Sequence, residues 1–165
     1  MPTHLIITGG TLDKKYDELS GDLVFDESHL PAMLERARFT GEVTTQKLLM
    51  KDSLDMTEED RQLIAGACNE TPDIQIVITH GTDTMIETAQ TIANMKELGA
   101  KTIVLTGAMV PYSFGEKSDA LFNLGTALAF AQSLPSGVYV AMNGRHFAHD
   151  NVHKDKAAGL FKELS

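Results

Sequence analysis

Three stretches of this chain share one pattern: LIITGGT at residues 5–11, IVITHGTD at 76–83 and IVLTGAM at 103–109. In each, an apolar run is followed by threonine and then by a turn that contains glycine. This pattern is typical of a buried β-strand that ends in a sharp turn. In an open parallel sheet the carboxyl ends of the strands meet at one edge, where ligands bind. We therefore expect Thr11, Thr82 and Asp83 to share one polar pocket.

Strand and helix patterns alternate along the rest of the chain. The expected strands are residues 3–8, 43–50, 74–79, 102–106 and 138–142. The expected helices are 30–37, the stretch between 57 and 72, 84–98 and 120–132. Residues 143–165 are polar at first and then weakly helical in pattern. The alternation predicts an α/β fold, a single doubly wound and mainly parallel sheet with helices on both faces.

Local signals predict how three of these helices begin. Ser28 can cap the first, and Thr57 to Asp60 has the composition of a capping box for the second. For the third, Thr84 can supply the cap and Glu87 its reciprocal partner. That would leave Thr82 and Asp83 less needed for structure, although both residue types are themselves common helix caps.

Composition limits the classes of function. The net charge of −9 argues against nucleic acid as a partner, and no apolar run is long enough to span a membrane. The first residues lack the features of a signal peptide. Cys68 is the only cysteine, which suits a reducing compartment, so we expect a cytoplasmic protein with one domain over residues 1–165. The spacing of Cys68 from Ile64 favours a buried, inert thiol.

Residues 12–27 form an unusually long and polar connection between a strand and a helix. We interpret this segment as a flap over the strand ends because it begins beside Thr11. The alternative is a solvated hairpin without a role. Tyr16 lies on this segment beside Lys14 and Lys15, and nearby cations favour the phenolate, so it could accept a proton from Thr11.

Besides Tyr16, four side chains have the chemistry for catalysis. Thr11, after two glycines, offers a hydroxyl nucleophile beside backbone N–H groups, although a plain strand end or a phosphate-binding turn has the same appearance. Lys154, near a threonine and the carboxylate of Asp83, could assist the Thr82 hydroxyl or act as a base. The alternatives are a solvated lysine and, for Tyr16, an exposed loop aromatic.

Three histidines offer a competing interpretation. His146, His149 and His153 are spaced three and four residues apart, so on a helix they would share one face and could hold a divalent metal. The segment has poor helix propensity, and histidines near a surface turn are often incidental. We expect no metal and no cofactor.

Several motifs occur in the order found in the L-asparaginase/glutaminase amidohydrolases of bacterial type, which the chain resembles along its whole length. They are TGGTL at 8–12, DSLDM at 52–56, ITHGTDTM at 78–85, TGAM at 106–109 with Pro111, FNL at 122–124 and VHK at 152–154. The resemblance implies that Thr11 is the nucleophile and Tyr16 its flap partner, and that Thr82, Asp83 and Lys154 form a second catalytic group.

The resemblance also implies a substrate and its contacts. Ser53 and Asp83 would hold the α-carboxylate and α-amino group of L-asparagine, and the backbone of Ala108 would face its side-chain amide. Backbone N–H groups near Gly10 and Thr82 would stabilise the oxyanion. The products would be L-aspartate and ammonia, and the protein would work as a homodimer.

Three departures from the family pattern stand out. The chain ends soon after Lys154, which is expected of a short-chain form that lacks the second domain of the family. Leu54 replaces a polar residue, and Tyr16 follows Thr11 by only five residues. Three other functions remain open: a non-catalytic amino-acid-binding or regulatory module, a metal-dependent hydrolase built on the histidines, and an ammonia-supplying subunit of an amidotransferase.

Overall fold

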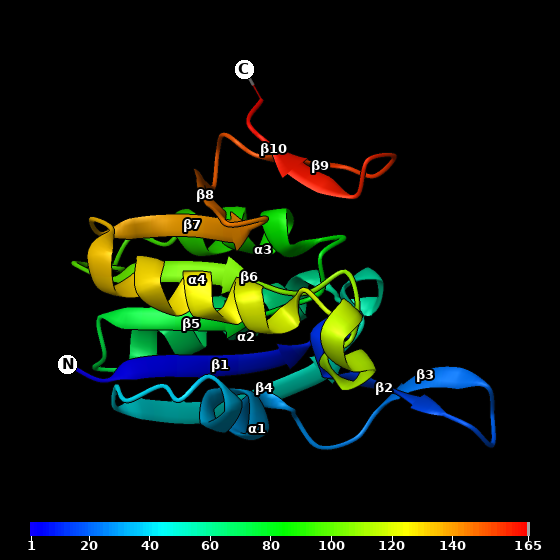
Figure 1. Cartoon of the computed structure of the whole chain (residues 1–165). Helices are drawn as coiled ribbons and strands as arrows, with labels where there is room; N and C mark the ends of the chain where they lie inside the picture. Colours follow the sequence, from blue (N-terminus) through cyan, green and yellow to red (C-terminus); the bar gives the residue numbers. More distant parts are fainter. Residues whose placement is uncertain (165) are drawn as a thin grey trace.

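A six-stranded sheet forms the centre of the molecule in a computed structural model that describes residues 1–164 (Figure 1). Its strand order is β4-β1-β5-β6-β7-β8, and every neighbouring pair except β7 and β8 is parallel. The strands are β1 (Thr3–Gly9), β4 (Val43–Lys51), β5 (Gln75–Thr79), β6 (Thr102–Thr106), β7 (Gly137–Met142) and β8 (Arg145–Ala148). The prediction of a mainly parallel sheet is therefore confirmed.

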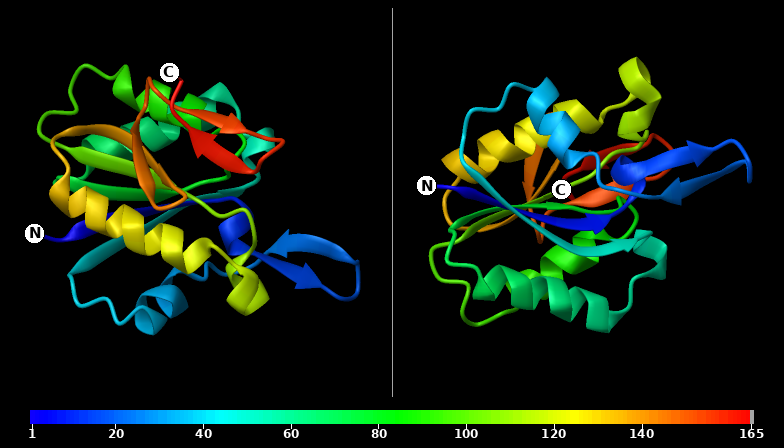
Figure 2. Two further views of the ribbon diagram at one scale, coloured as in Figure 1. Left: turned by 45° about the horizontal axis from the view of Figure 1, so that its top comes forward. Right: turned by 90° about the horizontal axis from the view of Figure 1, so that it is seen from below.

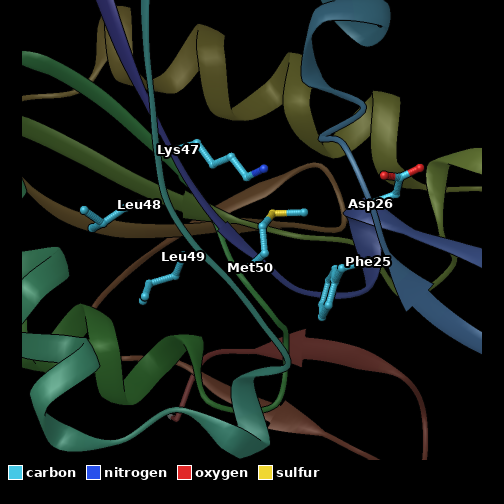
Figure 3. A pocket seen from close by; sticks show the side chains of 6 residues that line it. All are labelled: Phe25, Asp26, Lys47, Leu48, Leu49 and Met50. Atoms are coloured by element: carbon cyan, nitrogen blue, oxygen red, sulfur yellow. The ribbon is translucent and has the colours of Figure 1, made fainter.

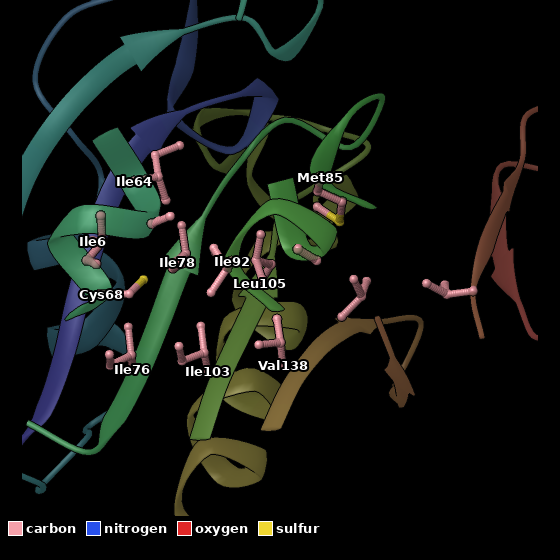
Figure 4. Packing of buried hydrophobic residues seen from close by; sticks show 14 of the residues in the cluster. Ile6, Ile64, Cys68, Ile76, Ile78, Met85, Ile92, Ile103, Leu105 and Val138 are labelled. Carbon is pink, nitrogen blue, oxygen red and sulfur yellow. The ribbon is translucent and has the colours of Figure 1, made fainter. Parts of the chain in front are cut away.

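Helices cover both faces of this sheet (Figure 2). They are α1 (Leu30–Arg36), α2 (Glu58–Glu70), α3 (Met85–Ala93) and α4 (Ala120–Ser133). Residues of β1 alternate between the faces. Ile6 belongs to the apolar cluster with α2 and α3 (Figure 4). Leu5 belongs to the cluster with α1 and α4. Cys68 of α2 is fully buried in the first cluster, and burial raises the pKa of its thiol to about 12. The expectation of an inert thiol agrees with this position.

The register of the central strands aligns their carboxyl ends. Ile7 pairs with Thr79 across β1 and β5, and Thr79 pairs with Thr106 across β5 and β6. The three glycine-containing turns therefore follow one row of the sheet, as the repeated pattern predicts. Because β5 lies between β1 and β6, the turn that carries Thr82 lies between the other two.

The third helix differs from its prediction at both ends. It stops at Ala93 instead of Leu98, since the last fully buried helical position is Ile92 and the chain then continues as turns. The Thr84 side chain makes no capping hydrogen bond; its hydroxyl lies instead against the Ser53 carbonyl, to which it donates a hydrogen bond (2.8 Å). The Thr57 capping box of α2 is confirmed, and the Ser28 hydroxyl accepts the Leu30 amide at the start of α1 (3.2 Å).

The C-terminal segment forms strands, so the weak helical prediction for it is wrong. Asn143 and Gly144 both have positive φ (58° and 73°) and turn the chain from β7 into antiparallel β8. An Asn-Gly pair is the strongest short-range signal for such a hairpin. Two further short strands, β9 (His153–Asp155) and β10 (Leu160–Lys162), then pair with each other.

Residues 12–27 form a 3-10 turn and a hairpin. The elements are η1 (Thr11–Asp13), β2 (Lys14–Asp17) and β3 (Asp22–Phe25). The hairpin extends beyond the carboxyl ends of the strands, away from the body of the sheet (Figures 1 and 2). Its use as a flap stays a prediction. In the part of the chain before Ser165, no helix is long and apolar enough to cross a membrane.

Candidate active site

The Thr11 turn follows β1 and is fixed by close backbone packing. The Gly10 amide donates a hydrogen bond to the Lys51 carbonyl (3.0 Å). Gly10 has φ 80° and ψ 175°, and a Cβ on it would lie 2.6 Å from the Cα of Gly81. Only glycine permits both this conformation and this contact. The turn that carries Thr11 therefore lies directly against the turn that carries Thr82.

Thr82, Asp83 and Lys154 form one hydrogen-bonded group. The Lys154 ammonium donates to Thr82 Oγ1 and to Asp83 Oδ1, both at 2.8 Å. The Lys154 side chain is only 10% exposed, because β9 and β10 bring it back to the sheet edge from the end of the chain. This hydrogen bond is the main reason why the pKa of Asp83 lies below its ordinary value. An ammonium held against a hydroxyl favours the alkoxide form of that hydroxyl.

Ser53 presents a buried hydroxyl to the same place. It lies in η2 (Ser53–Asp55), directly after β4, and is 1% exposed. Within residues 1–164 its Oγ has no hydrogen-bond partner, and it packs against Gly81, where an added Cβ would lie 2.5 Å from that oxygen. A buried polar atom without a partner carries a desolvation cost unless a ligand or water satisfies it. This position therefore suits a polar group of a bound molecule.

The third turn is held by a carboxylate. Both oxygens of Asp119 accept the Met109 amide (3.0 Å), and one of them also accepts the Val110 amide (3.0 Å). The Asn123 side chain donates to the Gly107 carbonyl (2.9 Å) and to Asp119 (3.0 Å). Ala108, which lies between these contacts, is 1% exposed. Asp119 directly precedes α4, and no local sequence pattern indicates that it supports the third turn.

The buried His80 side chain supports the Thr82 turn by contacts with Gly81 and Thr88. It is fully buried, with Nδ1 2.8 Å from the Gly81 carbonyl and Nε2 2.8 Å from the Thr88 hydroxyl. A carbonyl can only accept, so Nδ1 carries the proton and Nε2 accepts from Thr88. Burial lowers the pKa of His80 to about 4, which keeps the ring neutral. No role was assigned to His80 from the sequence, although its place inside the threonine-glycine motif was visible.

Tyr16 lies apart from this group. It is on β2, paired with Leu23, and its side chain is 58% exposed. Among the hydrogen bonds of residues 1–164, none joins its hydroxyl to Thr11. The structure therefore brings together Thr82, Asp83 and Lys154 beside the Thr11 turn, and it leaves Tyr16 on the protruding hairpin.

The three histidines do not share a helix face. His146 lies on β8, where its ring packs against Phe130 (centroids 5.0 Å apart) and Tyr139 (6.1 Å). His153 lies on β9, beyond a turn. No group of three histidine, cysteine, aspartate or glutamate side chains in the described chain is placed to hold a metal ion. The helical arrangement that motivated the metal hypothesis is therefore wrong.

A separate cavity of about 410 Å³ lies along β4 beside the hairpin (Figure 3). Its lining residues are Phe25, Asp26, Lys47, Leu48, Leu49 and Met50. None of these belongs to the group around Thr11 and Thr82. The candidate active site is thus the junction of the three turns, defined by Thr11, Ser53, Thr82, Asp83 and Lys154.

The chain is similar in sequence and in fold to known proteins. Residues 3–161 match the family model described as "Asparaginase, N-terminal". The chain is 33% identical over 156 residues to an L-asparaginase of Thermococcus kodakarensis, with 93% of this chain and 47% of that protein covered. It is 33% identical over 170 residues to L-asparaginase 1 of Escherichia coli K12, with 95% and 48% covered.

A solved structure shows the same similarity in three dimensions. The thermostable L-asparaginase from Thermococcus kodakarensis superimposes with a TM-score of 0.87 at 31% identity, with 99% of this chain and 51% of that chain covered. The chain therefore spans about half the length of the curated relatives that it matches.

Proposed function

The chain belongs to the asparaginase family, and from this premise we propose that it hydrolyses the side-chain amide of L-asparagine to L-aspartate and ammonia. One observation carries the proposal: the Lys154 ammonium contacts both Thr82 Oγ1 and Asp83 Oδ1 at 2.8 Å, beside the turn that carries Thr11. A hydroxyl, an ammonium and a carboxylate at the edge of a parallel sheet suit acyl transfer.

In the first step Thr11 Oγ1 attacks the amide carbon of the substrate. A C–O bond forms, the carbonyl oxygen becomes an oxyanion, and backbone N–H groups near Gly10 and Thr82 stabilise its charge. The oxyanion then collapses, the C–N bond breaks, and the nitrogen leaves as ammonia with the proton that Thr11 gave up. The product of this step is an ester between Thr11 and the aspartyl group.

In the second step water attacks the ester carbon. Thr82, polarised by Lys154, accepts a hydrogen bond from this water and orients it, while Asp83 holds the Lys154 ammonium in place. The C–O bond to Thr11 breaks, the water proton returns to Thr11, and aspartate leaves. Tyr16, on the hairpin, would assist the first proton transfer only after the hairpin closes over the turn.

Substrate contacts follow from the same geometry. The Ser53 hydroxyl, which has no partner within residues 1–164, would donate to the α-carboxylate. The carboxylate of Asp83, whose side chain is 32% exposed, would accept from the α-ammonium. Ala108 would present its backbone to the side-chain amide. Leu54, which is 68% exposed, offers no hydrogen bond at this rim, so we expect weak substrate affinity.

The test is ammonia release from L-asparagine, D-asparagine and L-glutamine at high millimolar concentration. Thr11→Ala and Thr82→Ala should each abolish release, while Thr91→Ala, on the exposed side of α3, should leave it unchanged. Robust release by either active-site variant would refute the assigned roles. Thermal stabilisation by L-aspartate without any turnover would instead support an amino-acid-binding module.

We also propose that the active form is a homodimer, the commonest symmetric assembly. Sedimentation equilibrium across a range of protein concentrations would measure the mass. A mass of one chain at every concentration that supports activity would exclude the dimer.

A further inference from the structure

One ion pair connects the Thr11 turn to the segment that carries Ser53. Lys14, three residues after Thr11, forms a salt bridge through its ammonium with Asp52, which directly precedes Ser53. The Lys14 side chain is 15% exposed and that of Asp52 is 36% exposed. A pair that is partly withdrawn from water is screened less than a surface pair and holds its geometry better.

The Lys14 end of this pair has little freedom to move. Its carbonyl accepts a hydrogen bond from the Ser113 hydroxyl (3.0 Å), and its ammonium lies 5.4 Å from the centre of the Phe25 ring. The preceding residue, Asp13, is fully buried and accepts from the Ser28 hydroxyl and the His29 amide, both at 2.8 Å. These contacts therefore hold both strands of the hairpin, β2 and β3, at its base.

The Asp52 end leads directly into the active site. The carbonyl of Ser53 accepts from the Thr84 hydroxyl (2.8 Å), and its side chain packs against Gly81. A displacement of Asp52 would therefore move the Ser53 hydroxyl relative to the Thr82 turn. The same displacement would change the distance between the Ser53 hydroxyl and Thr11, because Lys14 follows Thr11 by three residues on a well-anchored segment.

We propose that Lys14 and Asp52 are positioning residues, which set the place of the Ser53 hydroxyl relative to Thr11 without touching the substrate. The inference rests on the proposed hydrolase function. In this proposal the base of the hairpin is rigid, and the Lys14–Asp52 ion pair connects it to the substrate-binding residue Ser53. The tip of the hairpin can move independently.

The chain supplies a matched control on the same strand. Lys15 forms an equivalent ion pair with Asp26 (2.6 Å), but both side chains are well exposed and neither adjoins the site. We expect Lys14→Met to raise KM for L-asparagine about tenfold with kcat close to that of the unchanged protein, since Ser53 acts in binding. Lys15→Met should leave KM within about twofold of the wild-type value. A purely structural role would lower the active fraction, and so kcat, without moving KM.

A double-mutant cycle tests the coupling. Asp52→Asn should raise KM to a similar extent, and the double variant Lys14→Met/Asp52→Asn should be no worse than the poorer single variant. Multiplicative losses, or equal effects of the Lys14 and Lys15 substitutions, would overturn the proposal. Thermal unfolding of each variant would show whether the folded fraction is comparable.

Amide hydrogen exchange separates this inference from the proposed function. Exchange in residues 50–54 should become faster in Lys14→Met and in Asp52→Asn, but not in Lys15→Met. If the wild-type protein releases no ammonia but the variants show these differences in exchange, the proposed hydrolase function is refuted and the positioning role of Lys14 and Asp52 is supported. If exchange in 50–54 is unaffected by Lys14→Met, the positioning pair is refuted whatever the activity.

Discussion

Replacing Gly10 by alanine would test the contact that brings the two threonines together. The Gly10 backbone has φ 80° and ψ 175°, a conformation that costs a residue with a side chain ~1–3 kcal/mol. The added Cβ would also lie 2.6 Å from the Gly81 Cα, and relieving such an overlap costs ~1–3 kcal/mol. Together these costs predict a loss of about 2–6 kcal/mol in the free energy of unfolding.

Gly21→Ala is the control for this substitution. Gly21 also has positive φ (76°), but it lies at the tip of the hairpin, and a Cβ there would meet nothing within 4 Å. Its cost should therefore be the backbone contribution alone, about 1–2 kcal/mol. Urea unfolding at neutral pH measures both variants. If Gly10→Ala loses no more stability than Gly21→Ala, the turns are not in close contact and the geometry argued for Thr11 and Thr82 is wrong.

Three further predictions concern titratable groups. His80, whose pKa falls from 6.5 to about 4 through burial, is protonated in the unfolded chain before it is protonated in the folded one. Its contribution to stability is complete above pH ~6.5 and is lost as the pH falls towards 4, by about 3 kcal/mol. Urea unfolding at pH 7.5 and 4.5 would measure this loss in the free energy of unfolding. If the free energy of unfolding of His80→Asn depends on pH in the same way, the contribution of His80 is refuted. Lys154→Met should lower kcat by ~10²–10⁴ and raise the pKa of Asp83 towards its ordinary value. Ammonia release and an NMR titration would measure the two effects, and a kcat within threefold of the unchanged protein would contradict the role of Lys154. Cys68, with its pKa at about 12, should react with a thiol reagent at pH 8 only after unfolding, so rapid labelling of the native protein would disagree with its burial.

The repeated threonine-glycine turns made the architecture and the place of the site predictable from sequence. Each turn follows an apolar run, and carboxyl ends of parallel strands share an edge, so Thr11 and Thr82 had to lie near each other if the strands were neighbours. The order β1-β5-β6 satisfies that condition. Local sequence patterns do not predict this strand order, because packing over the whole domain determines which strands are neighbours.

Two features were missed for different physical reasons. After residue 143, a weak helical periodicity and the Asn143-Gly144 hairpin signal conflict, and the structure follows the turn chemistry. The failure of Thr84 to cap α3 has another origin. Its side chain is oriented towards the Ser53 carbonyl, to which it donates a hydrogen bond, and no local rule contains this contact between residues 31 positions apart. The same kind of long-range contact places Lys154 at the site.

The backbone contacts between the turns predict that this site tolerates conservative changes in the core around it. Gly10 and Gly81 meet backbone to backbone, and Gly107 lies so close to the His80 carbonyl that a Cβ would overlap it. Main-chain contact therefore limits how closely the three turns approach one another. A large-to-small change such as Ile78→Val removes apolar contacts beneath the sheet and should cost ~0.5–1.5 kcal/mol in stability. It leaves the distances between the turns unchanged, so its effect should fall on unfolding and not on KM, which is the reverse of the expectation for Lys14→Met.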